Sequence, residues 1–479
     1  SDRFCANSCS RPANSKTKGC KTMKKRLLAI ACAAAMVVTM FAGCNGGGES
    51  STSSAAQESS GATSSAADES SAAGESSTAE ESSEAAGGEL SVSGDVEIEF
   101  FQQKREAVDS FQAVIDAFME QNPNITVTQN VVPDASTVLM TRAASNDIPD
   151  VMMHWPTDSQ FVQFAQQGRV KALDDTQALG NVMDNYLDAV KFEDGHYYCI
   201  PFSGNFMGVF YDVDKFEEAG YEIPTTWDEL ITIAEDIKSK GEVAFVFPDK
   251  DAWTLSQLQG NILGKDRADS SEFYAQMEAG ETTFQDDELT VQSWGKILQL
   301  HEYSQGDTLS LGYDQAISDF ATGTGYMFPQ GSWAAPSIEA ANPDKNFDMF
   351  PMPNDSGDIQ QPLGLDTGLC LGVNEHGEDA ATASEMFLNF ISSVEGAQIY
   401  ADLDHSPSCI EGVEADIPQG TGVVEILDEK GVLSMEVLPA GFEETKRSKI
   451  QQVLIDGDIE GLLTTLTEEI GRASCRERV

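Results

Sequence analysis

Basic residues are scarce in this chain of 479 residues. Lysine and arginine number 29 against 79 aspartates and glutamates, which gives a formal net charge of −50. Outside the leader described below, no cluster of basic residues suggests a groove that follows a phosphate backbone. So acidic a surface repels nucleic acid, anionic membranes and anionic substrates. We therefore expect no nucleic-acid partner and a neutral or cationic ligand.

Cysteines are also few in the part of the chain that is expected to fold. The chain has nine, but most fall in the terminal segments or the leader discussed below: Cys5, Cys9, Cys20, Cys32, Cys44 and Cys475. Cys199, Cys370 and Cys409 remain, and no CxxC or Cys/His spacing accompanies them. The sequence therefore predicts no disulfide framework and no metal site. Each of the three is expected to pack as a small apolar residue.

The chain lacks the short motifs that mark several enzyme classes. It has no GxSxG elbow, no HExxH, no P-loop and no GxGxxG, so nothing points to a catalytic nucleophile, a catalytic metal or a nucleotide cofactor. A glycosidase needs only two carboxylates at a suitable separation. Because so acidic a chain contains many carboxylates, the motifs alone leave a secreted glycoside hydrolase open as an alternative.

A leader follows the first methionine. Met23 is followed by basic residues at 24–26 and an apolar run at 27–41, and Ala42-Gly43-Cys44 comes next. This order resembles a bacterial lipoprotein signal, although Phe41 stands where the resemblance has Leu. The apolar run is shorter than the roughly 20 residues that a bilayer span requires, so a transmembrane anchor is the weaker alternative. We expect residues 23–43 to be a signal peptide and Cys44 to carry a lipid such as palmitate, which anchors a chain without spanning the membrane.

Three further segments lie outside the expected folded part. Residues 1–22 precede the leader and are interpreted as upstream translated sequence. Residues 44–94 are mostly Ser, Ala, Glu, Gly and Thr and cannot bury enough apolar surface to offset their ordering entropy, so they are expected to form a tether. Residues 470–479 look like the translation of a sequencing adapter and are discounted, which leaves the amphipathic segment 450–466 near the end.

The remaining part, from Asp95 onward, is too long for one ordinary core and predicts two lobes or domains. Short strand-like runs alternate with amphipathic helices, which is typical of an α/β fold. Residues 95–101 alternate as a strand, and residues 125–128 resume strand character after a helix that ends at Asn122-Pro123. That helix has its apolar residues at helical spacing: Phe111, Val114, Ile115 and Phe118.

A second helix begins at a sequence-level capping box, Thr226 to Glu229. Its apolar face ends before Gly241, and residues 243–247 are then predicted to form a buried strand. Another helix is marked by an apolar face near the end of the chain: Ala383, Met386, Phe387, Phe390 and Ile391.

Five blocks of sequence resemble, in order, the family-1 extracellular solute-binding proteins, which include maltose-binding and multiple-sugar-binding proteins. The blocks are NDIPDV at 146–151, GRVKAL at 168–173, the pair DGHYYCIP and VFYDVDKF within 194–216, IPTTWDEL at 223–230, and GYMFPQGSW at 325–333. Asp212 stands where members of the family usually have Asn. The resemblance extends over residues 95–469.

This resemblance implies a two-lobed periplasmic-binding-protein fold of type II, in the α/β class, with a hinge and a ligand cleft between the lobes. Lobe 1 is expected at 95–204 and 367–409, and lobe 2 at 205–366 and 410–469. The function implied is that of a substrate-binding lipoprotein of an ABC importer, without catalysis or cofactor. It would capture a mono- or oligosaccharide at the extracellular face of the cell membrane, as a monomer, for permease and ATPase partners. A binding protein for a polyamine or a peptide is the other alternative.

Within the family, residues 101–106 (FQQKRE) are most similar to raffinose- and multiple-sugar-binding members, in which a Lys-x-Glu after the first strand faces the ligand. The resemblance thus places Lys104 and Glu106 in the cleft. The alternative is a solvated helix start, where the helix dipole favours Glu in any case.

Flat aromatic rings and fixed polar groups are what a sugar site needs, because a sugar presents apolar C–H faces and a rim of hydroxyls. Of the five tryptophans, Trp227 in the capping box and Trp294 on an amphipathic helix are expected in the core. Trp155, Trp253 and Trp333 are the candidates for stacking on a sugar, with ordinary packing between the lobes as the alternative.

Asp366 and Phe206 complete the candidate site. Asp366 lies in the block GLDTG, at the expected second crossing between the lobes, where its carboxylate could accept two sugar hydroxyls. A turn carboxylate that bonds its own backbone is the alternative. Phe206, in the hinge strand SGNF, is a weaker candidate for which core packing fits equally well.

Overall fold

The structure is a computed structural model, and it describes residues 90–132, 135–192, 194–373, 376–434 and 442–477. The predicted signal peptide, the lipid site at Cys44 and almost all of the predicted tether lie outside the described residues. Over the residues that are described, no helix combines the length and the apolar character that crossing a membrane requires.

One mixed sheet organises the described chain. Its strands follow the order β2-β1-β3-β8-β4-β6-β5, with β7 paired to β4 and β9 paired to β8. β1 is parallel to β2, whereas β4 is antiparallel to both β6 and β8. The strands are β1 (Val96–Phe101), β2 (Ile125–Asn130), β3 (Val151–His154), β4 (Ile200–Asp212), β5 (Val243–Phe245), β6 (Gly325–Gly331), β7 (Phe347–Phe350), β8 (Gln361–Leu371) and β9 (Gly431–Leu433).

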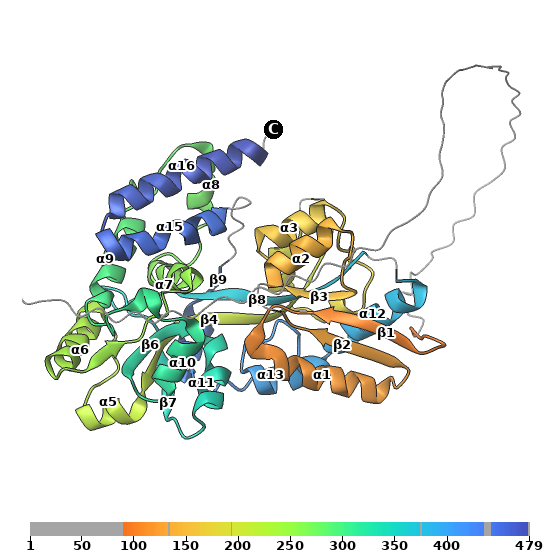
Figure 1. The fold of residues 1–479 in the computed structure, drawn as a ribbon, viewed down its shortest axis with the longest axis horizontal. Coiled ribbons are helices and arrows are strands. Elements are labelled where there is room, and N and C mark those ends of the chain that lie inside the picture. Colours follow the sequence, from red (N-terminus) through yellow and green to blue (C-terminus); the bar gives the residue numbers. More distant parts are fainter. Residues whose placement is uncertain (1–89, 133–134, 193, 374–375, 435–441, 478–479) are drawn as a thin grey trace, which may run out of the picture. The chain divides into compact units, whose positions relative to one another are not determined.

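The first group of helices packs around β1, β2 and β3 (Figure 1). The predicted βαβ opening is confirmed, since α1 connects two parallel strands and buries the four apolar residues expected on its inner face. The helices of this group are η1 (Arg105–Ala107), α1 (Val108–Gln121), α2 (Ala135–Ala144), α3 (Ser159–Gln166), η2 (Ala178–Asn181), α4 (Asp184–Val190), α12 (Glu378–Ile391) and α13 (Val394–Asp404).

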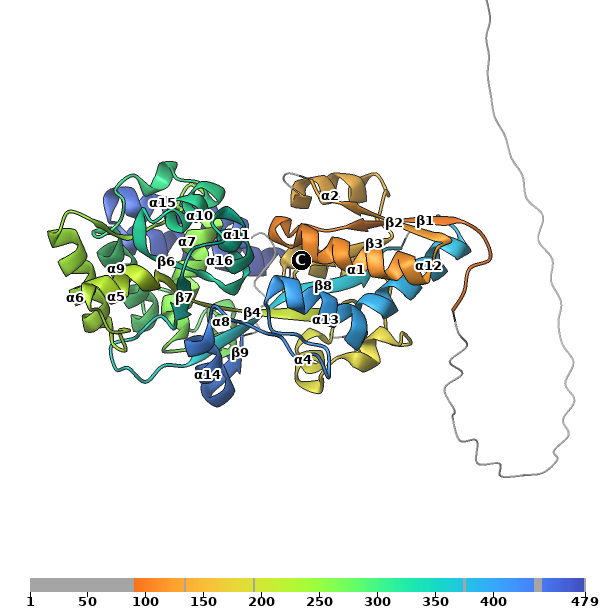
Figure 2. The same ribbon diagram turned by 90° about the horizontal axis from the view of Figure 1, so that it is seen from below.

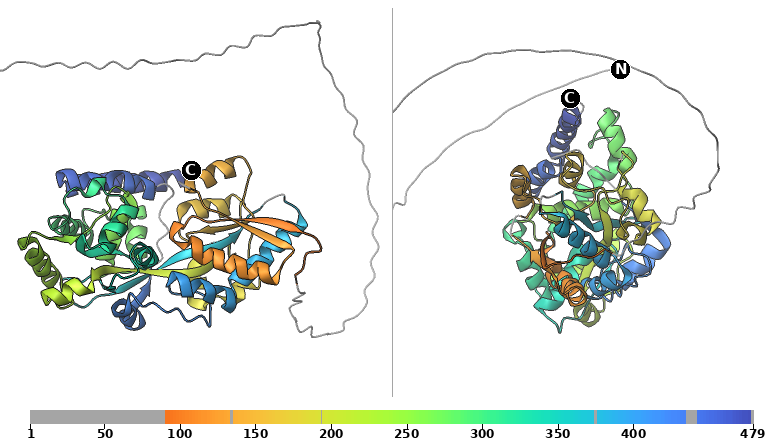
Figure 3. Two further views of the ribbon diagram at one scale, coloured as in Figure 1. Left: turned by 60° about the horizontal axis from the view of Figure 1, so that its bottom comes forward. Right: turned by 90° about the vertical axis from the view of Figure 1, so that its right-hand side faces the viewer.

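The second group of helices surrounds the β5–β7 part of the sheet, and α15 and α16 pack on α7, α8 and α9 (Figures 1 and 3). Its members are α5 (Val213–Ala219), α6 (Trp227–Ser239), α7 (Ala252–Gly264), α8 (Ser271–Ala279), α9 (Glu288–His301), η3 (Thr308–Ser310), α10 (Tyr313–Ala321), η4 (Ser332–Ala334), α11 (Ala335–Ala341), α14 (Thr421–Lys430), α15 (Phe442–Asp456) and α16 (Ile459–Glu477).

The buried apolar residues form separate clusters that match the two groups of helices. One cluster draws on residues 98–202 together with 365–410. Two further clusters draw on residues from 206 onward, and one of these also includes residues 442–470. The separation supports two lobes with discontinuous sequence, and the limits given above for each lobe remain a prediction.

Strand β4 runs from the first core into the others, and β8 lies beside it (Figure 2). The apolar residues of β8 belong to the first core, and this strand also contacts α7 and α14. The two strands pair antiparallel, with shifts of register around Ser203. A Cβ atom at Gly364 would lie 2.6 Å from Oδ1 of Asn205, and one at Gly204 would lie 3.2 Å from the Gly364 carbonyl oxygen. Glycine at both positions therefore lets the two strands approach this closely without displacing the Asn205 side chain or the Gly364 carbonyl.

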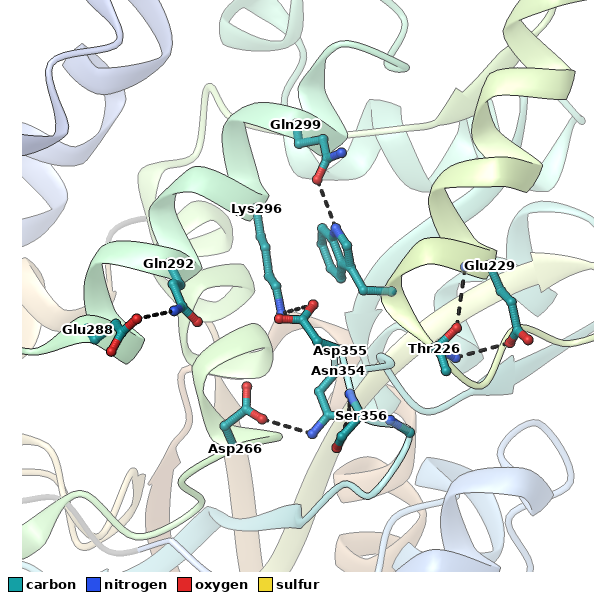
Figure 4. A network of polar contacts seen from close by, with 12 residues as sticks. Thr226, Glu229, Asp266, Glu288, Gln292, Lys296, Gln299, Asn354, Asp355 and Ser356 are labelled. Carbon is teal, nitrogen blue, oxygen red and sulfur yellow. Dashed lines mark hydrogen bonds and ion pairs between the residues drawn. The ribbon is translucent and has the colours of Figure 1, made fainter.

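The predicted capping box at the start of α6 is confirmed. The Thr226 hydroxyl accepts from the Glu229 backbone N–H, and the Glu229 carboxylate accepts from the backbone N–H of Thr226 (Figure 4). Trp227, the first residue of the helix, is buried in the second lobe, and its Nε1 donates to Gln299. Trp294 is buried in the same core, so both tryptophans take the core positions expected of them.

The three cysteines outside the doubtful segments are free and buried, as expected. Two predicted segments differ in the structure. The strand expected at 243–247 ends at Phe245, and Pro248, three residues later, has no N–H for a sheet ladder. The segment 450–466 is not one helix, because Gly457 adopts a positive φ of 69° between α15 and α16. The discounted residues 470–477 continue α16, and Ile470 is buried in the second lobe.

Lys265, directly after α7, joins both crossing strands from the second lobe. Its buried ammonium group donates to Oε1 of Gln361 at 2.5 Å and to the carbonyl oxygen of Met207 at 3.4 Å. No carboxylate bonds to it among the described residues, and burial lowers the pKa of Lys265 to about 7. A neutral amine has two N–H groups, which matches these two acceptors.

Lys265→Met should remove a pH dependence of stability. Between about pH 7 and the ordinary lysine pKa of 10.5, the unfolded chain holds a proton that the folded chain lacks, so this group makes the parent more stable as the pH rises. The stability of the variant relative to the parent should therefore fall by roughly 2–3 kcal/mol between pH 7.5 and 9.5. Urea unfolding at several pH values measures this change.

Lys430→Met is the matched control, because Lys430 lies nearby on the surface and pairs with Asp358. It should show no comparable trend in this pH range. Lys265→Met also leaves Oε1 of Gln361 without its hydrogen-bond partner, which lowers stability by the same amount at every pH. The test therefore compares how steeply the free energy of unfolding changes with pH, not its absolute value. Equal slopes for the parent and Lys265→Met would contradict an uncharged buried amine.

Candidate functional site

Lys104 lies in the connection between β1 and η1, and its side chain is buried. The backbone N–H of Lys104 donates to Oε1 of Gln102, which holds the connection in an extended conformation. The ammonium group donates to Oδ2 of Asp366 at 2.7 Å, to Asp404 at 2.9 and 3.1 Å, and to the hydroxyl of Tyr400 at 3.3 Å. Burial alone would lower the pKa of Lys104, but Asp366 and Asp404 outweigh it and hold that pKa well above the usual value.

Asp366 brings the crossing strands into the same network. It lies on β8, and its Oδ1 accepts from Nδ2 of Asn205 on β4 at 3.2 Å. Asp404 and Tyr400 belong to α13. The network therefore connects the loop after β1, one helix of the first lobe and both crossing strands. We call Lys104, Asp366, Asp404 and Tyr400 the lysine cluster.

Glu106, on η1, is half-buried and accepts no hydrogen bond from another side chain of the described residues. Burial raises its pKa, and Asp366 and Asp404 raise it further, while Lys104 and the backbone N–H of Glu106 itself act in the opposite direction. A carboxyl in this position can accept a hydrogen bond when ionised and donate one when protonated.

Three aromatic rings from the second lobe meet. Trp253 lies at the start of α7, Tyr313 at the start of α10 and Trp333 in η4. The ring of Trp253 lies 4.9 Å from that of Tyr313 and 6.3 Å from that of Trp333, between centroids. We call these three side chains the aromatic group.

Local contacts fix the aromatic group. The carboxylate of Asp251, which precedes α7, accepts from the backbone N–H of Tyr313 at 2.7 Å and so holds the starts of α7 and α10 together. A Cβ atom at position 331 would lie 2.0 Å from the ring of Trp333. Glycine at 331 is therefore required for Trp333 to fold back over the end of β6.

Three polar atoms beside these rings are buried without a hydrogen bond of normal geometry within the described part of the chain: Tyr313 OH, Trp333 Nε1 and Gln330 Oε1. Trp333 is nevertheless close enough to the Tyr313 hydroxyl to lower the pKa of Tyr313. Buried polar atoms are paired in the great majority of cases. Two groups that can donate and one that accepts are thus available to water or to the hydroxyls of a ligand.

The pKa of Tyr313, in the second lobe, is affected by charged residues that follow β1 in the first lobe. Burial raises the pKa of Tyr313 well above its usual value, Glu106 raises it further, and Lys104 and Trp333 oppose them. Next to these residues, Arg105 of η1 donates to Asp314 of α10 at 3.4 Å. The loop after β1 therefore faces the start of α10.

Among the predicted site residues, the structure brings Lys104 together with Asp366, and Trp253 together with Trp333. Trp155 follows β3 and is half-buried against the first core, where its backbone N–H donates to Nδ1 of His154 at 2.9 Å. Phe206 is 1% exposed in the second lobe, which favours core packing. Phe206 shares its buried cluster with Tyr313 and Trp333, and its backbone N–H donates to the hydroxyl of Ser332 at 3.4 Å. The ligand-binding roles of all seven predicted residues remain predictions.

Several polar residues of the site were missed from sequence: Asn205, Tyr313, Gln330, Tyr400 and Asp404. Gln330 lies inside the block GYMFPQGSW and Asn205 inside SGNF, so a closer analysis of these two blocks could have found them. Nothing near Tyr400 or Asp404 in the sequence indicates a partner about 300 residues earlier.

Away from the site, the structure has a pocket of about 360 Å³, and the described residues offer no metal-binding cluster. The pocket contains none of the predicted site residues; it is lined by Lys265, Asp266, Asp358, Ile359, Gln360, Lys430, Gly431 and Val432. In the described residues no group of three or more His, Cys, Asp or Glu side chains is arranged to hold a metal ion.

Residues 113–421 match the family model described as bacterial extracellular solute-binding protein. The chain belongs to this family. A multiple sugar-binding protein of Streptococcus mutans is 28% identical over 327 residues, which cover 67% of this chain and 77% of that protein. An osmoprotective compounds-binding protein of Synechocystis is 25% identical over 303 residues, which cover 59% and 66%.

Solved structures of solute-binding proteins confirm the fold. The complex of RafE with raffinose has a TM-score of 0.66 at 24% identity and covers 79% of this chain and 99% of RafE. A chitin oligosaccharide binding protein has a TM-score of 0.68 at 20% identity and covers 80% of this chain and 99% of that protein. The type II, two-lobed α/β fold expected from the sequence is therefore correct.

Proposed function

We propose that this solute-binding protein captures a mono- or oligosaccharide between its lobes and presents it to the permease and ATPase subunits of an ABC importer. The observation that carries the proposal is the aromatic group, bordered by three buried polar atoms that make no hydrogen bond of normal geometry among the described residues. The names of the related proteins, which bind multiple sugars, raffinose and chitin oligosaccharides, support it.

The chemistry of the site suits a sugar. Aromatic faces pack against the C–H faces of a pyranose, while Tyr313, Trp333, Gln330 and Glu106 offer donors and acceptors for its hydroxyls. Lys104 is already paired with carboxylates, so it offers no free cation to an anionic ligand. An uncharged ligand fits this arrangement better than an acidic one.

Capture would favour the approach of the lobes. Glu106 and Asp366 belong to the loop after β1 and to a crossing strand, and the aromatic group belongs to the second lobe. A ligand that contacts both sets gains its full interaction energy only when they are close, so it shifts the population toward that arrangement.

Binding without turnover is part of the proposal. Asp366 and Asp404 both bond the same ammonium group, which leaves neither of them placed as a separate acid and base. We include anchoring at the extracellular face through a lipid on Cys44, as a monomer, on the basis of the leader sequence and the family. A hydrolase remains the alternative that the first experiment below also addresses.

A thermal-shift screen of the purified protein against neutral mono- and oligosaccharides tests the function. A ligand that binds only the folded state stabilises it by RT ln(1 + [L]/Kd), about 2.7 kcal/mol at a hundredfold excess over Kd. At least one sugar should raise Tm, and chromatography should recover it unchanged. Stabilisation only by polyamines or peptides, or product release abolished by a single carboxylate substitution, would refute the proposal.

Trp253→Ala should weaken sugar binding with limited loss of stability, because this ring is only half-buried. Loss of an aromatic anchor typically costs on the order of 2 kcal/mol, which corresponds to a roughly thirtyfold higher Kd. Trp294→Ala is the control: it removes a buried indole from the core and should lower stability by roughly 3–5 kcal/mol while the folded fraction binds normally. Calorimetry paired with unfolding decides, and parent-like affinity of Trp253→Ala would rule out the aromatic group as the sugar platform.

Cys44→Ala should release the protein from the membrane fraction, because the acylated cysteine is proposed as the sole anchor. Fractionation of cells that produce the parent or the variant, followed by mass determination of the product, measures this. A Cys44→Ala protein that stays with the membrane after its leader has been removed would count against lipid anchoring.

A further inference from the structure

We propose that Lys104 is a positioning residue that does not contact the ligand. In this role it holds the carboxylate of Asp366 in its ionised form and fixes its orientation toward the ligand. The inference rests on the proposed function, because it assigns a role inside the same site.

The ammonium group of Lys104 has no N–H left for a ligand. A lysine ammonium carries three N–H groups, and three residues accept from it: Asp366, Asp404 and Tyr400. Its side chain is 2% exposed. A direct contact with a sugar would have to break one of these buried bonds.

The two carboxylates of the lysine cluster are not equivalent. Asp404 is 1% exposed and uses both of its oxygens on Lys104. Asp366 uses only Oδ2 on Lys104, and its Oδ1 accepts a single bond from Asn205 at 3.2 Å. Each carboxylate thus accepts two hydrogen bonds and keeps further acceptor positions, but the side chain of Asp366 is 7% exposed against 1% for Asp404, so Asp366 is the more accessible acceptor.

Charge balance explains why the cation is needed. Two buried carboxylates that share one site do not both ionise without a counter-ion, because each disfavours the charge of the other and burial disfavours both. Lys104 supplies that counter-ion. Asp404 bonds the same ammonium through both of its oxygens and takes up part of its charge, so Asp366 is not fully neutralised and remains a strong acceptor.

Packing holds the cluster in place. The ring of Tyr400 lies 4.8 Å from that of Phe111 and 4.9 Å from that of Phe202, between centroids. Burial, and after it Asp404, raises the pKa of Tyr400 well above its usual value, while Lys104 opposes them. Tyr400 is therefore a neutral hydroxyl fixed by the first core, and it orients the ammonium group from one side.

Lys104→Met tests the assignment, with calorimetric Kd values measured from pH 6 to 9. The probe is raffinose, or otherwise the neutral sugar that raises Tm most in the screen. At pH 7 the variant should retain a proton on its carboxylate pair and bind the sugar roughly tenfold or more weakly, because hydrogen bonds to charged acceptors are about twice as strong as neutral ones. Affinity should recover as the pH rises and Asp366 ionises.

The parent profile serves as the reference, because Glu106, Tyr313, Asp404 and Tyr400 face the same region and are common to both proteins. Lys191→Met is the matched control, since it removes an exposed lysine of the first lobe that lies outside the site and should leave both the affinity and its pH profile unchanged. A Lys104→Met loss of the same size at every pH would identify Lys104 as a direct ligand contact and overturn the proposal, as would no loss at all.

Lys104→Met leaves two buried carboxylates without a partner and could fail to fold. The double variant Lys104→Met/Asp404→Leu removes one of them and should show the same recovery of affinity with rising pH. Infrared spectroscopy gives a readout without ligand: at pH 7 the double variant should show the C=O band of a protonated carboxyl, absent from the parent and lost when Asp366→Asn is added. If no sugar binds the parent, the proposed function fails, whereas the infrared result still tests Lys104; absence of that band overturns the inference.

Discussion

The close antiparallel pairing of β4 and β8 is the constraint on which the rest of the structure depends. Strand β4 leaves the first core and enters the others, and β8, whose apolar residues belong to the first core, pairs with it along this crossing. Gly204 and Gly364 permit the approach, and Asn205 fills the space beside Gly364 and donates to Asp366. Because the site residues come from both sides of this crossing, its geometry decides how far apart they lie.

Two buried lysines fasten the crossing strands in different ways. Lys104 is held by two carboxylates, which stabilise its charge, whereas Lys265 bonds only neutral acceptors and has a pKa of about 7. Burial opposes charge at both positions, and the presence or absence of carboxylates decides the outcome. The lysine cluster therefore keeps a buried cation beside the proposed site, while Lys265 connects α7, which carries Trp253, to the crossing strands.

Sequence patterns sufficed for much of the fold and for part of the site. Periodicity located α1 and α6 because their apolar faces and caps are local features, and the five ordered blocks indicated the family. Contacts between distant segments carry no such local signal, so the sequence indicated neither Asp404 nor Tyr400, nor the pairing of the Lys104 ammonium with two carboxylates. Phe206 is buried because residues of α10 and α14 pack around it. These helices are distant in sequence, so the pattern of the strand that contains Phe206 does not reveal this burial.

Small-angle scattering of the purified protein with and without saturating sugar tests the central claim most directly. The account holds that one ligand contacts groups on both lobes and that the crossing strands allow the lobes to approach. It predicts a smaller radius of gyration in the complex than in the free protein under identical buffer conditions. An unchanged radius, with saturation demonstrated by calorimetry on the same sample, would contradict capture between the lobes.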